Sequence, residues 1–213
     1  TTTTTSRAGR REFLKASGVV AGAAMLGALP IARSAHAQGS DVLRIGLIGC
    51  GGRGTGAAVT ALEADPNTKI VALADAFGDQ VQSSLAQLNK AQPGRVDVTP
   101  ERCFAGFDAY QQLIDCGVDV VILGETPHFR PKHLKAAIDA GKHVFCEKPV
   151  AVDAPGVRSV LATTDEAKKK NLAIVSGLCW RYHPCVRETM QRLADGAIGD
   201  ILSIQETYMT GAV

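Results

Sequence analysis

Residues 43–54 have the sequence Leu-Arg-Ile-Gly-Leu-Ile-Gly-Cys-Gly-Gly-Arg-Gly, an apolar run that ends in a glycine-rich turn. Its last six residues, Gly49 to Gly54, satisfy the pattern G-x-G-x-x-G. The run from residue 42 to 49 has the composition of a buried strand, and residues 54–64 have that of a helix. A glycine loop between a strand and a helix is the arrangement that cradles the diphosphate of a dinucleotide.

The glycines of this pattern have different expected tasks. Gly49 permits the tight turn, Gly51 lets the backbone approach a diphosphate, and Gly54 brings helix and strand together. Asp75 follows Gly54 by 21 residues, at the end of the next apolar run. A carboxylate there binds the ribose 2′-hydroxyl of NAD and repels the 2′-phosphate of NADP, so NAD is the predicted cofactor and NADP is disfavoured. The alternative is a purely structural glycine turn with a solvated Asp75.

Strand-like apolar runs alternate with helical patterns along the chain. The expected strands are residues 42–49, 68–74, 118–123, 143–146 and 172–176. The expected helices are residues 54–64, 79–90, 109–116, 131–140 and 154–171. Strands that are near-continuous runs of Val, Ile and Leu, with helices between them, indicate a parallel sheet covered on both faces. We therefore predict an α/β fold, a doubly wound parallel sheet of the Rossmann type, over residues 42–178.

The pattern changes after about Trp180. Residues 184–195 have a helical pattern, and residues 201–208 alternate like a strand with one exposed face. We expect residues 179–213 to be the truncated start of a second α/β domain, which holds the substrate and forms oligomers, and the chain to be a fragment of a longer protein.

Residues 1–37 have the features of an export signal rather than of a fold. Arg10-Arg11 and a short Phe-Leu-Lys sequence precede a 14-residue apolar stretch, residues 19–32, and Ala35-His36-Ala37 provides a cleavage site before Gln38. The stretch is shorter than a membrane span. Adjacent arginines in this setting resemble the twin-arginine signal, which predicts a periplasmic protein that uses the twin-arginine export machinery. A basic amphipathic N-terminal helix is the alternative.

Composition excludes several classes of protein. The chain is 46% hydrophobic and 21% charged, which is too apolar for intrinsic disorder. Five of the 23 basic residues and one of the 21 acidic residues lie in residues 1–37, so the remainder carries a net charge of −2. That balance does not favour nucleic acid as a partner. We interpret the six cysteines, which form no C-x-x-C pair, as core residues rather than as a metal site.

A second motif, Ala140-Gly141-Lys142-His143-Val144-Phe145-Cys146-Glu147-Lys148-Pro149, ends the expected strand at residues 143–146. Ligands bind at the carboxyl edge of such sheets, and a lysine there can exchange a proton with a substrate hydroxyl. A solvated surface lysine is the alternative for Lys148. Together with the glycine loop and Asp75, this motif resembles the Gfo/Idh/MocA family of oxidoreductases over roughly residues 42–208.

The resemblance implies a nucleotide-binding N-terminal domain, with Lys148 beside the nicotinamide as the catalytic group for proton transfer. It implies a homo-oligomer built by the second domain and a second catalytic His or Asp beyond Val213. The full expected cofactor-binding set is Gly49, Gly51, Gly52, Arg53, Gly54, Asp75, Thr126, Pro127, His128, Glu147, Lys148, Trp180 and Arg181.

The segment Gly124-Glu125-Thr126-Pro127-His128 departs from the Ala-Thr-Pro-Pro-His common in that family. The added carboxylate of Glu125 can weaken NAD binding or engage a substrate hydroxyl. His128 has a structural contact as its alternative role.

Three functions remain open from the sequence. The first is an exported NAD-dependent oxidoreductase that transfers hydride between nicotinamide and a sugar, polyol or related hydroxy compound. The second is an NAD-dependent glycosidase of the same superfamily, which needs no external oxidant. The third is a non-catalytic binding protein that retains the fold.

Overall fold

The computed structural model describes residues 42–207, whose centre is a six-stranded parallel sheet with strand order β3-β2-β1-β4-β5-β6. The strands are β1 (Leu43–Ile48), β2 (Thr68–Asp75), β3 (Cys103–Ala105), β4 (Val120–Leu123), β5 (His143–Cys146) and β6 (Ile174–Ser176). The longer helices are α2 (Gly52–Ala64), α3 (Gly78–Ala91), α4 (Ala109–Asp115), α5 (Arg130–Asp139), α6 (Ala154–Lys169) and α7 (Pro184–Ala194). Single 3-10 turns are η1 (Pro100–Arg102) and η2 (Cys179–Tyr182).

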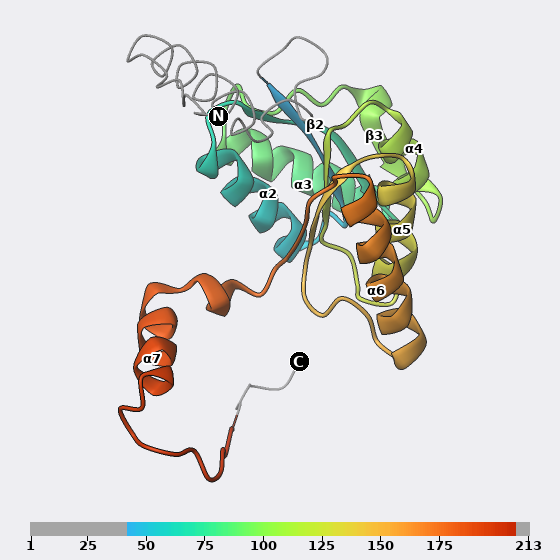
Figure 1. The fold of residues 1–213 in the computed structure, drawn as a ribbon. Helices are drawn as coiled ribbons and strands as arrows, with labels where there is room; N and C mark the ends of the chain where they lie inside the picture. The colour runs from blue at the N-terminus through green and yellow to red at the C-terminus, as the bar shows by residue number, and fades with distance from the viewer. Residues whose placement is uncertain (1–41, 208–213) are drawn as a thin grey trace, which may run out of the picture. The chain divides into compact units, whose positions relative to one another are not determined.

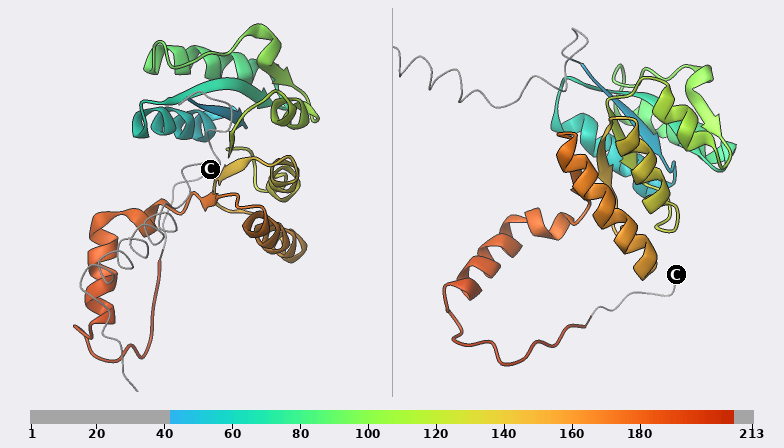
Figure 2. Two further views of the ribbon diagram at one scale, coloured as in Figure 1. Left: turned by 45° about the horizontal axis from the view of Figure 1, so that its top comes forward. Right: turned by 45° about the vertical axis from the view of Figure 1, so that its right-hand side comes forward.

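Helices cover both faces of the sheet, as Figures 1 and 2 show. On one face, Leu62 of α2 and Leu88 of α3 pack with Leu47 and Leu73 of the strands. On the other face, α4, α5 and α6 pack against the same strands through a second apolar cluster, which includes Leu134 of α5. Two cores therefore sandwich the sheet, which explains why the central parts of its strands are apolar on both faces. The fold confirms the predicted doubly wound α/β class.

The order of the strands reverses between β1 and β4, which are parallel neighbours. The chain runs outward from β1 to β3 on one side and then outward from β4 to β6 on the other. At such a reversal the loops that follow the two central strands diverge and leave a crevice at the carboxyl ends. The candidate site is therefore expected at the loops after β1 and β4.

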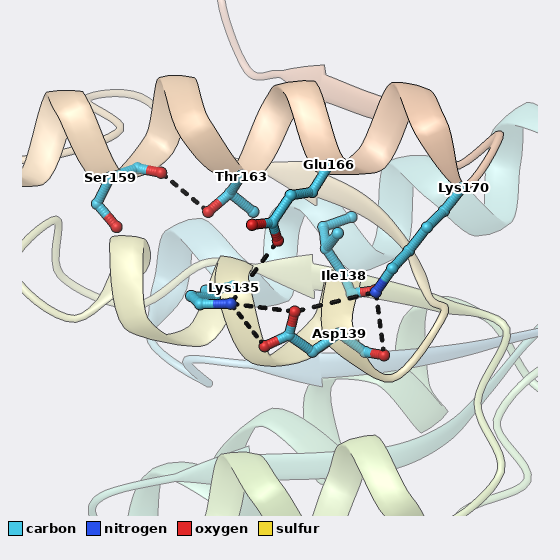
Figure 3. A network of polar contacts seen from close by, with 7 residues as sticks. All are labelled: Lys135, Ile138, Asp139, Ser159, Thr163, Glu166 and Lys170. Carbon is cyan, nitrogen blue, oxygen red and sulfur yellow. Dashed lines mark hydrogen bonds and ion pairs between the residues drawn. The ribbon is translucent and has the colours of Figure 1, made fainter.

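Figure 3 shows how α5 and α6 are joined on the outside of one helical layer. Lys135 of α5 pairs with Asp139 at 2.8 Å and with Glu166 of α6 at 3.7 Å. Lys170 at the end of α6 donates to the backbone oxygen of Ile138 at 3.0 Å. Exposed ion pairs of this kind contribute at most about 1 kcal/mol each, so they supplement the apolar packing beneath them.

Three expectations need correction. The sequence did not predict β3, because its three residues stand alone between Arg102 and Gly106 rather than within a longer apolar run. The strand expected over residues 201–208 is absent from its described part, residues 201–207, which has no regular structure. Only Cys50 and Cys146 are buried core cysteines, whereas Cys179 and Cys185 are exposed.

The export signal expected over residues 1–37 lies outside the described residues, and the predicted domain boundaries stay predictions. Among residues 42–207, no helix combines the length and apolar character needed to cross a bilayer.

Candidate functional site

The glycine loop after β1 is held by close backbone contacts. Gly49 has φ +91°, a conformation that favours glycine, and its N–H donates to the oxygen of Ala74 at 2.8 Å. A Cβ on Gly54 would lie 1.9 Å from the oxygen of Gly49. Nothing lies within 4 Å of a Cβ placed on Gly51. Gly49 and Gly54 therefore shape the loop, and Gly51 leaves space above it.

The helix that follows provides an electrostatic site for an anion. Helix α2 begins at Gly52, and no side chain caps its first turn. The first N–H groups of a helix lack intrahelical acceptors, and the helix dipole places a partial positive charge there. A phosphate group fits this end of α2.

The loop after β4 packs directly on the glycine loop. Gly124 donates its N–H to the oxygen of Ile48 at 2.7 Å. A Cβ on Gly124 would lie 2.6 Å from Cα of Gly54, and one on Gly49 would lie 2.1 Å from the nitrogen of Glu125. Glu125 is thus fixed beside the glycine loop.

Asp75 ends β2 with both carboxylate oxygens bonded to backbone donors. The N–H of Cys50 donates to Oδ2 at 2.7 Å, and the N–H of Phe77 donates to Oδ1 at 3.0 Å. Because two loops hold the carboxylate, its charge has a fixed position next to the glycine loop. Sequence reasoning gave Asp75 a ligand-binding role but did not show that it also supports the loop.

A cavity of about 630 Å³ lies over the carboxyl ends of the strands. Its walls come from the loops after β1, β2, β3 and β4 and include Gly49, Gly51 and Asp75. Aromatic side chains, among them Phe77 and Phe107, also line it. The cavity combines an anion-binding end, a fixed carboxylate and flat apolar walls.

A buried pair formed by Glu125 and His133 also lines this cavity. Oε1 of Glu125 lies 3.1 Å from Nδ1 of His133, and the two side chains are 10% and 9% exposed. The His133 ring stacks on Tyr110 with 4.1 Å between ring centroids. Within the described residues, Oε2 of Glu125 has no hydrogen-bond partner. Glu125 therefore places a second carboxylate in the wall, as its departure from the family pattern led us to consider.

Sequence reasoning missed His133 and Arg130 and named His128 instead. The structure places His128 at the surface, edge-on to Phe129 with 5.1 Å between centroids, and not in the cavity wall. Thr126 lines the cavity, and Pro127 does not. The sequence offered one signal for this region, which is Pro131, because a proline marks the first turn of a helix. A helix that follows a strand of a parallel sheet begins at the carboxyl edge of the sheet, so the residues near Pro131 could be expected close to the site.

The loop after β5 carries Glu147 and Lys148. Glu147 is fully buried, and its Oε1 lies 2.5 Å from a terminal nitrogen of Arg53 in α2. The hydrogen bond to Glu147 raises the pKa of Arg53. The N–H of Lys148 donates to Oε2 of Glu147 at 3.2 Å, and the Lys148 side chain is exposed. The structure thus joins the glycine loop to the lysine loop through Arg53 and Glu147, outside the cavity wall.

Trp180 and Arg181 lie in η2, and both are exposed. Neither lines the cavity. Their predicted role in cofactor binding stays a prediction.

These features define a dinucleotide-binding protein, because the open space at Gly51, the uncapped end of α2 and the Asp75 carboxylate fit the diphosphate and ribose of NAD(P). Residues 43–175 match the Gfo/Idh/MocA family model, described as the oxidoreductase family with an NAD-binding Rossmann fold. The chain belongs to this family and has an NAD(P)-binding Rossmann fold.

Two curated relatives show the range of activities among similar proteins. The chain is 27% identical over 169 residues to dTDP-3,4-didehydro-2,6-dideoxy-alpha-D-glucose 3-reductase from Actinomadura kijaniata, which covers 79% of this chain and 46% of that protein. It is 28% identical over 177 residues to glycosyl hydrolase family 109 protein 1 from Bacteroides fragilis, a match that covers 79% of this chain and 35% of that protein. The chain therefore spans less than half the length of these relatives.

Solved structures agree with the fold. A 3-ketoreductase from Actinomadura kijaniata in complex with NADP has a TM-score of 0.56 and 25% identity, covering 75% of this chain and 46% of that one. A scyllo-inositol dehydrogenase from Lactobacillus casei with bound NAD(H) and scyllo-inositol has a TM-score of 0.59, and the match covers 75% of this chain and 43% of that one. At 23% identity it supports the fold alone.

Proposed function

We propose that the protein is an exported NAD-dependent oxidoreductase that acts on a sugar, a polyol or a related hydroxy compound. The observation that carries this proposal is the cavity that joins the glycine loop to Asp75, with Lys148 following the neighbouring strand β5. Oxidoreductases and dehydrogenases of sugar-like compounds among the relatives support the substrate class.

The preference for NAD over NADP rests on Asp75. Its carboxylate cannot turn away easily, because Cys50 and Phe77 hold both of its oxygens. A fixed negative charge accepts a hydrogen bond from a ribose hydroxyl and repels a 2′-phosphate. The similar 3-ketoreductase was solved with NADP, so this preference is a property to be measured on this chain.

The proposed chemistry divides the two hydrogens of a substrate alcohol. NAD, when bound, supplies the acceptor for the hydride that leaves the carbon bearing the hydroxyl group. Lys148, in its neutral amine form, takes the hydroxyl proton, so that the carbon–oxygen bond becomes a double bond. Gly49 and Gly54 hold the loop that orients the diphosphate, and the first turn of α2 balances its charge.

Export to the periplasm by the twin-arginine machinery is part of this proposal and rests on residues 1–37. Because that pathway carries folded proteins, a cofactor can be loaded in the cytoplasm and remain bound. We also propose that the whole protein is a homo-oligomer, as the family resemblance implies.

An NAD-dependent glycosidase is the second candidate, favoured by the similarity to a family 109 glycosyl hydrolase. Such an enzyme oxidises its substrate transiently and returns the hydride, so no net NADH accumulates. The two candidates differ in whether turnover requires an external oxidant.

Lys148→Ala tests the proposed role, with Lys142→Ala, at the other end of β5, as the matched control. A panel of sugars and polyols is screened for NADH formation and for glycoside cleavage. We expect Lys148→Ala to abolish turnover and preserve NAD binding, and Lys142→Ala to resemble the wild type. Unchanged turnover in Lys148→Ala would remove the lysine from the reaction, and NAD binding without any turnover in the wild type would favour a binding protein.

A further inference from the structure

We propose that Arg130 is a positioning residue, which fixes Lys148 relative to the bound nicotinamide by joining the loops after β4 and β5. This inference rests on the proposed function of Lys148. No motif of the sequence includes Arg130, and one arginine at the start of a helix is an ordinary solvated residue in most proteins.

Arg130 is the first residue of α5, yet it is only 4% exposed. One terminal nitrogen donates to the backbone oxygen of Glu125, and the other donates to the backbone oxygen of Pro149. A cation at a helix N-terminus opposes the helix dipole, and its burial costs solvation free energy. The two carbonyl acceptors offset part of that cost, and they belong to two different loops.

The other side of Lys148 is also anchored. The N–H of Glu147 donates to the oxygen of Leu123 at 3.0 Å, and its carboxylate pairs with Arg53 of α2. The residues before and after Lys148 are therefore each tied to an arginine, one from α2 and one from α5. Lys148 itself is exposed. Its position is set by its neighbours rather than by contacts of its own ammonium group.

The planar guanidinium explains why an arginine is needed. Its two terminal nitrogens reach two carbonyl oxygens at once, whereas a lysine ammonium is a single point charge on a flexible stem. Loss of the bridge leaves the Pro149 carbonyl without this donor and lets the loop shift. A misplacement of about 1 Å costs roughly a hundredfold in rate for a group that must meet a reacting atom.

The test does not require the natural substrate. Lysines of the full chain are acetylated with succinimidyl acetate, with and without NAD, and the rate at Lys148 is followed by mass spectrometry with Lys69 as the internal reference. If bound NAD covers Lys148, NAD at ten times its Kd slows acetylation of Lys148 roughly tenfold. Calorimetry on the same samples gives the Kd for NAD.

We expect Arg130→Lys and Arg130→Ala to bind NAD within about threefold of the wild type, a difference of less than 1 kcal/mol. Protection of Lys148 should fall to less than about twofold, because the lysine no longer lies over the cofactor. Millimolar guanidinium should restore protection in Arg130→Ala. Arg44→Ala is the control, because it removes another doubly hydrogen-bonded arginine, which pairs with Asp119 at the opposite ends of the strands.

Full protection in both Arg130 variants would overturn the positioning role. A loss of protection in Arg44→Ala equal to that in Arg130→Ala would also overturn it, since general destabilisation would then account for the effect. Arg130→Lys retains the charge and most of the volume, so it keeps the test valid if Arg130→Ala fails to fold. A wild-type protein in which NAD binds without protecting Lys148 would refute the proposed function and this inference together.

Discussion

Three Gly→Ala substitutions in one loop and helix should have three different effects. At Gly54, the added Cβ would lie 1.9 Å from the backbone oxygen of Gly49. A backbone oxygen cannot rotate away as a side chain can. We therefore expect the free energy of unfolding to fall by about 3 kcal/mol, which is the upper end of the usual cost of overpacking. For a domain of this size that loss lowers the melting temperature by roughly 6–12 °C.

At Gly51, the added Cβ has nothing within 4 Å, and φ is −66°, which alanine adopts freely. Replacing glycine by alanine at a helix N-cap lowers the free energy of unfolding by less than about 1 kcal/mol. The methyl group instead occupies space that the diphosphate needs, and we expect the Kd for NAD to rise roughly ten- to hundredfold, equivalent to about 1.4–2.8 kcal/mol. Gly51→Ala should thus fold normally and bind poorly.

Gly56→Ala is the matched control, because Gly56 is exposed on α2 and its Cβ also has open space. Alanine in a helix interior should stabilise the fold by up to about 1 kcal/mol and leave NAD binding unchanged. Melting curves and NAD titrations of the three variants measure both properties. Equal NAD affinity in Gly51→Ala and Gly56→Ala would refute the assignment of Gly51 to the cofactor.

Other substitutions probe electrostatics and burial. Asp75→Asn should lower the ratio of the NADP dissociation constant to the NAD dissociation constant. Calorimetry measures both constants, and an unchanged ratio would contradict the repulsion argument. Burial raises the pKa of Asp119, but hydrogen bonding to Arg44 outweighs burial and lowers that pKa overall. The stability that this carboxylate provides is therefore present above its unfolded pKa of about 3.9, and it is lost as the pH falls through the folded pKa. Asp119→Asn should therefore be less stable at pH 7 and lose less stability in acid, as urea melts at several pH values would detect. Burial raises the pKa of Cys146 to about 12, so iodoacetamide should modify the exposed Cys185 of the native protein and spare Cys146.

The sequence predicted the fold well where a single local signal was strong. The near-continuous apolar runs located five strands, and the glycine pattern located the loop and the helix after it. β3 was missed because Cys103, Phe104 and Ala105 form an apolar run of only three residues, and their pairing with β2 is a contact distant in sequence. Strand β6 is equally short, but it overlaps the longer apolar run of residues 172–175, so the sequence could predict it.

The candidate site was predictable for the residues of the motifs but not for their supports. Periodicity does not reveal that Arg130 is buried, since its burial depends on carbonyls of Glu125 and Pro149 that only the folded chain brings together. The Glu125–His133 pair depends in the same way on where α5 begins. Such cross-loop contacts are properties of the tertiary structure.

The central claim is that the cavity beside the glycine loop binds NAD. Calorimetric titration of NAD and of NADP into the protein, after a melting curve has confirmed that it is folded, tests this claim most directly. Saturable binding of NAD, at least tenfold tighter than that of NADP, is the expected result, equivalent to about 1.4 kcal/mol or more. A folded protein that binds neither dinucleotide would contradict the claim.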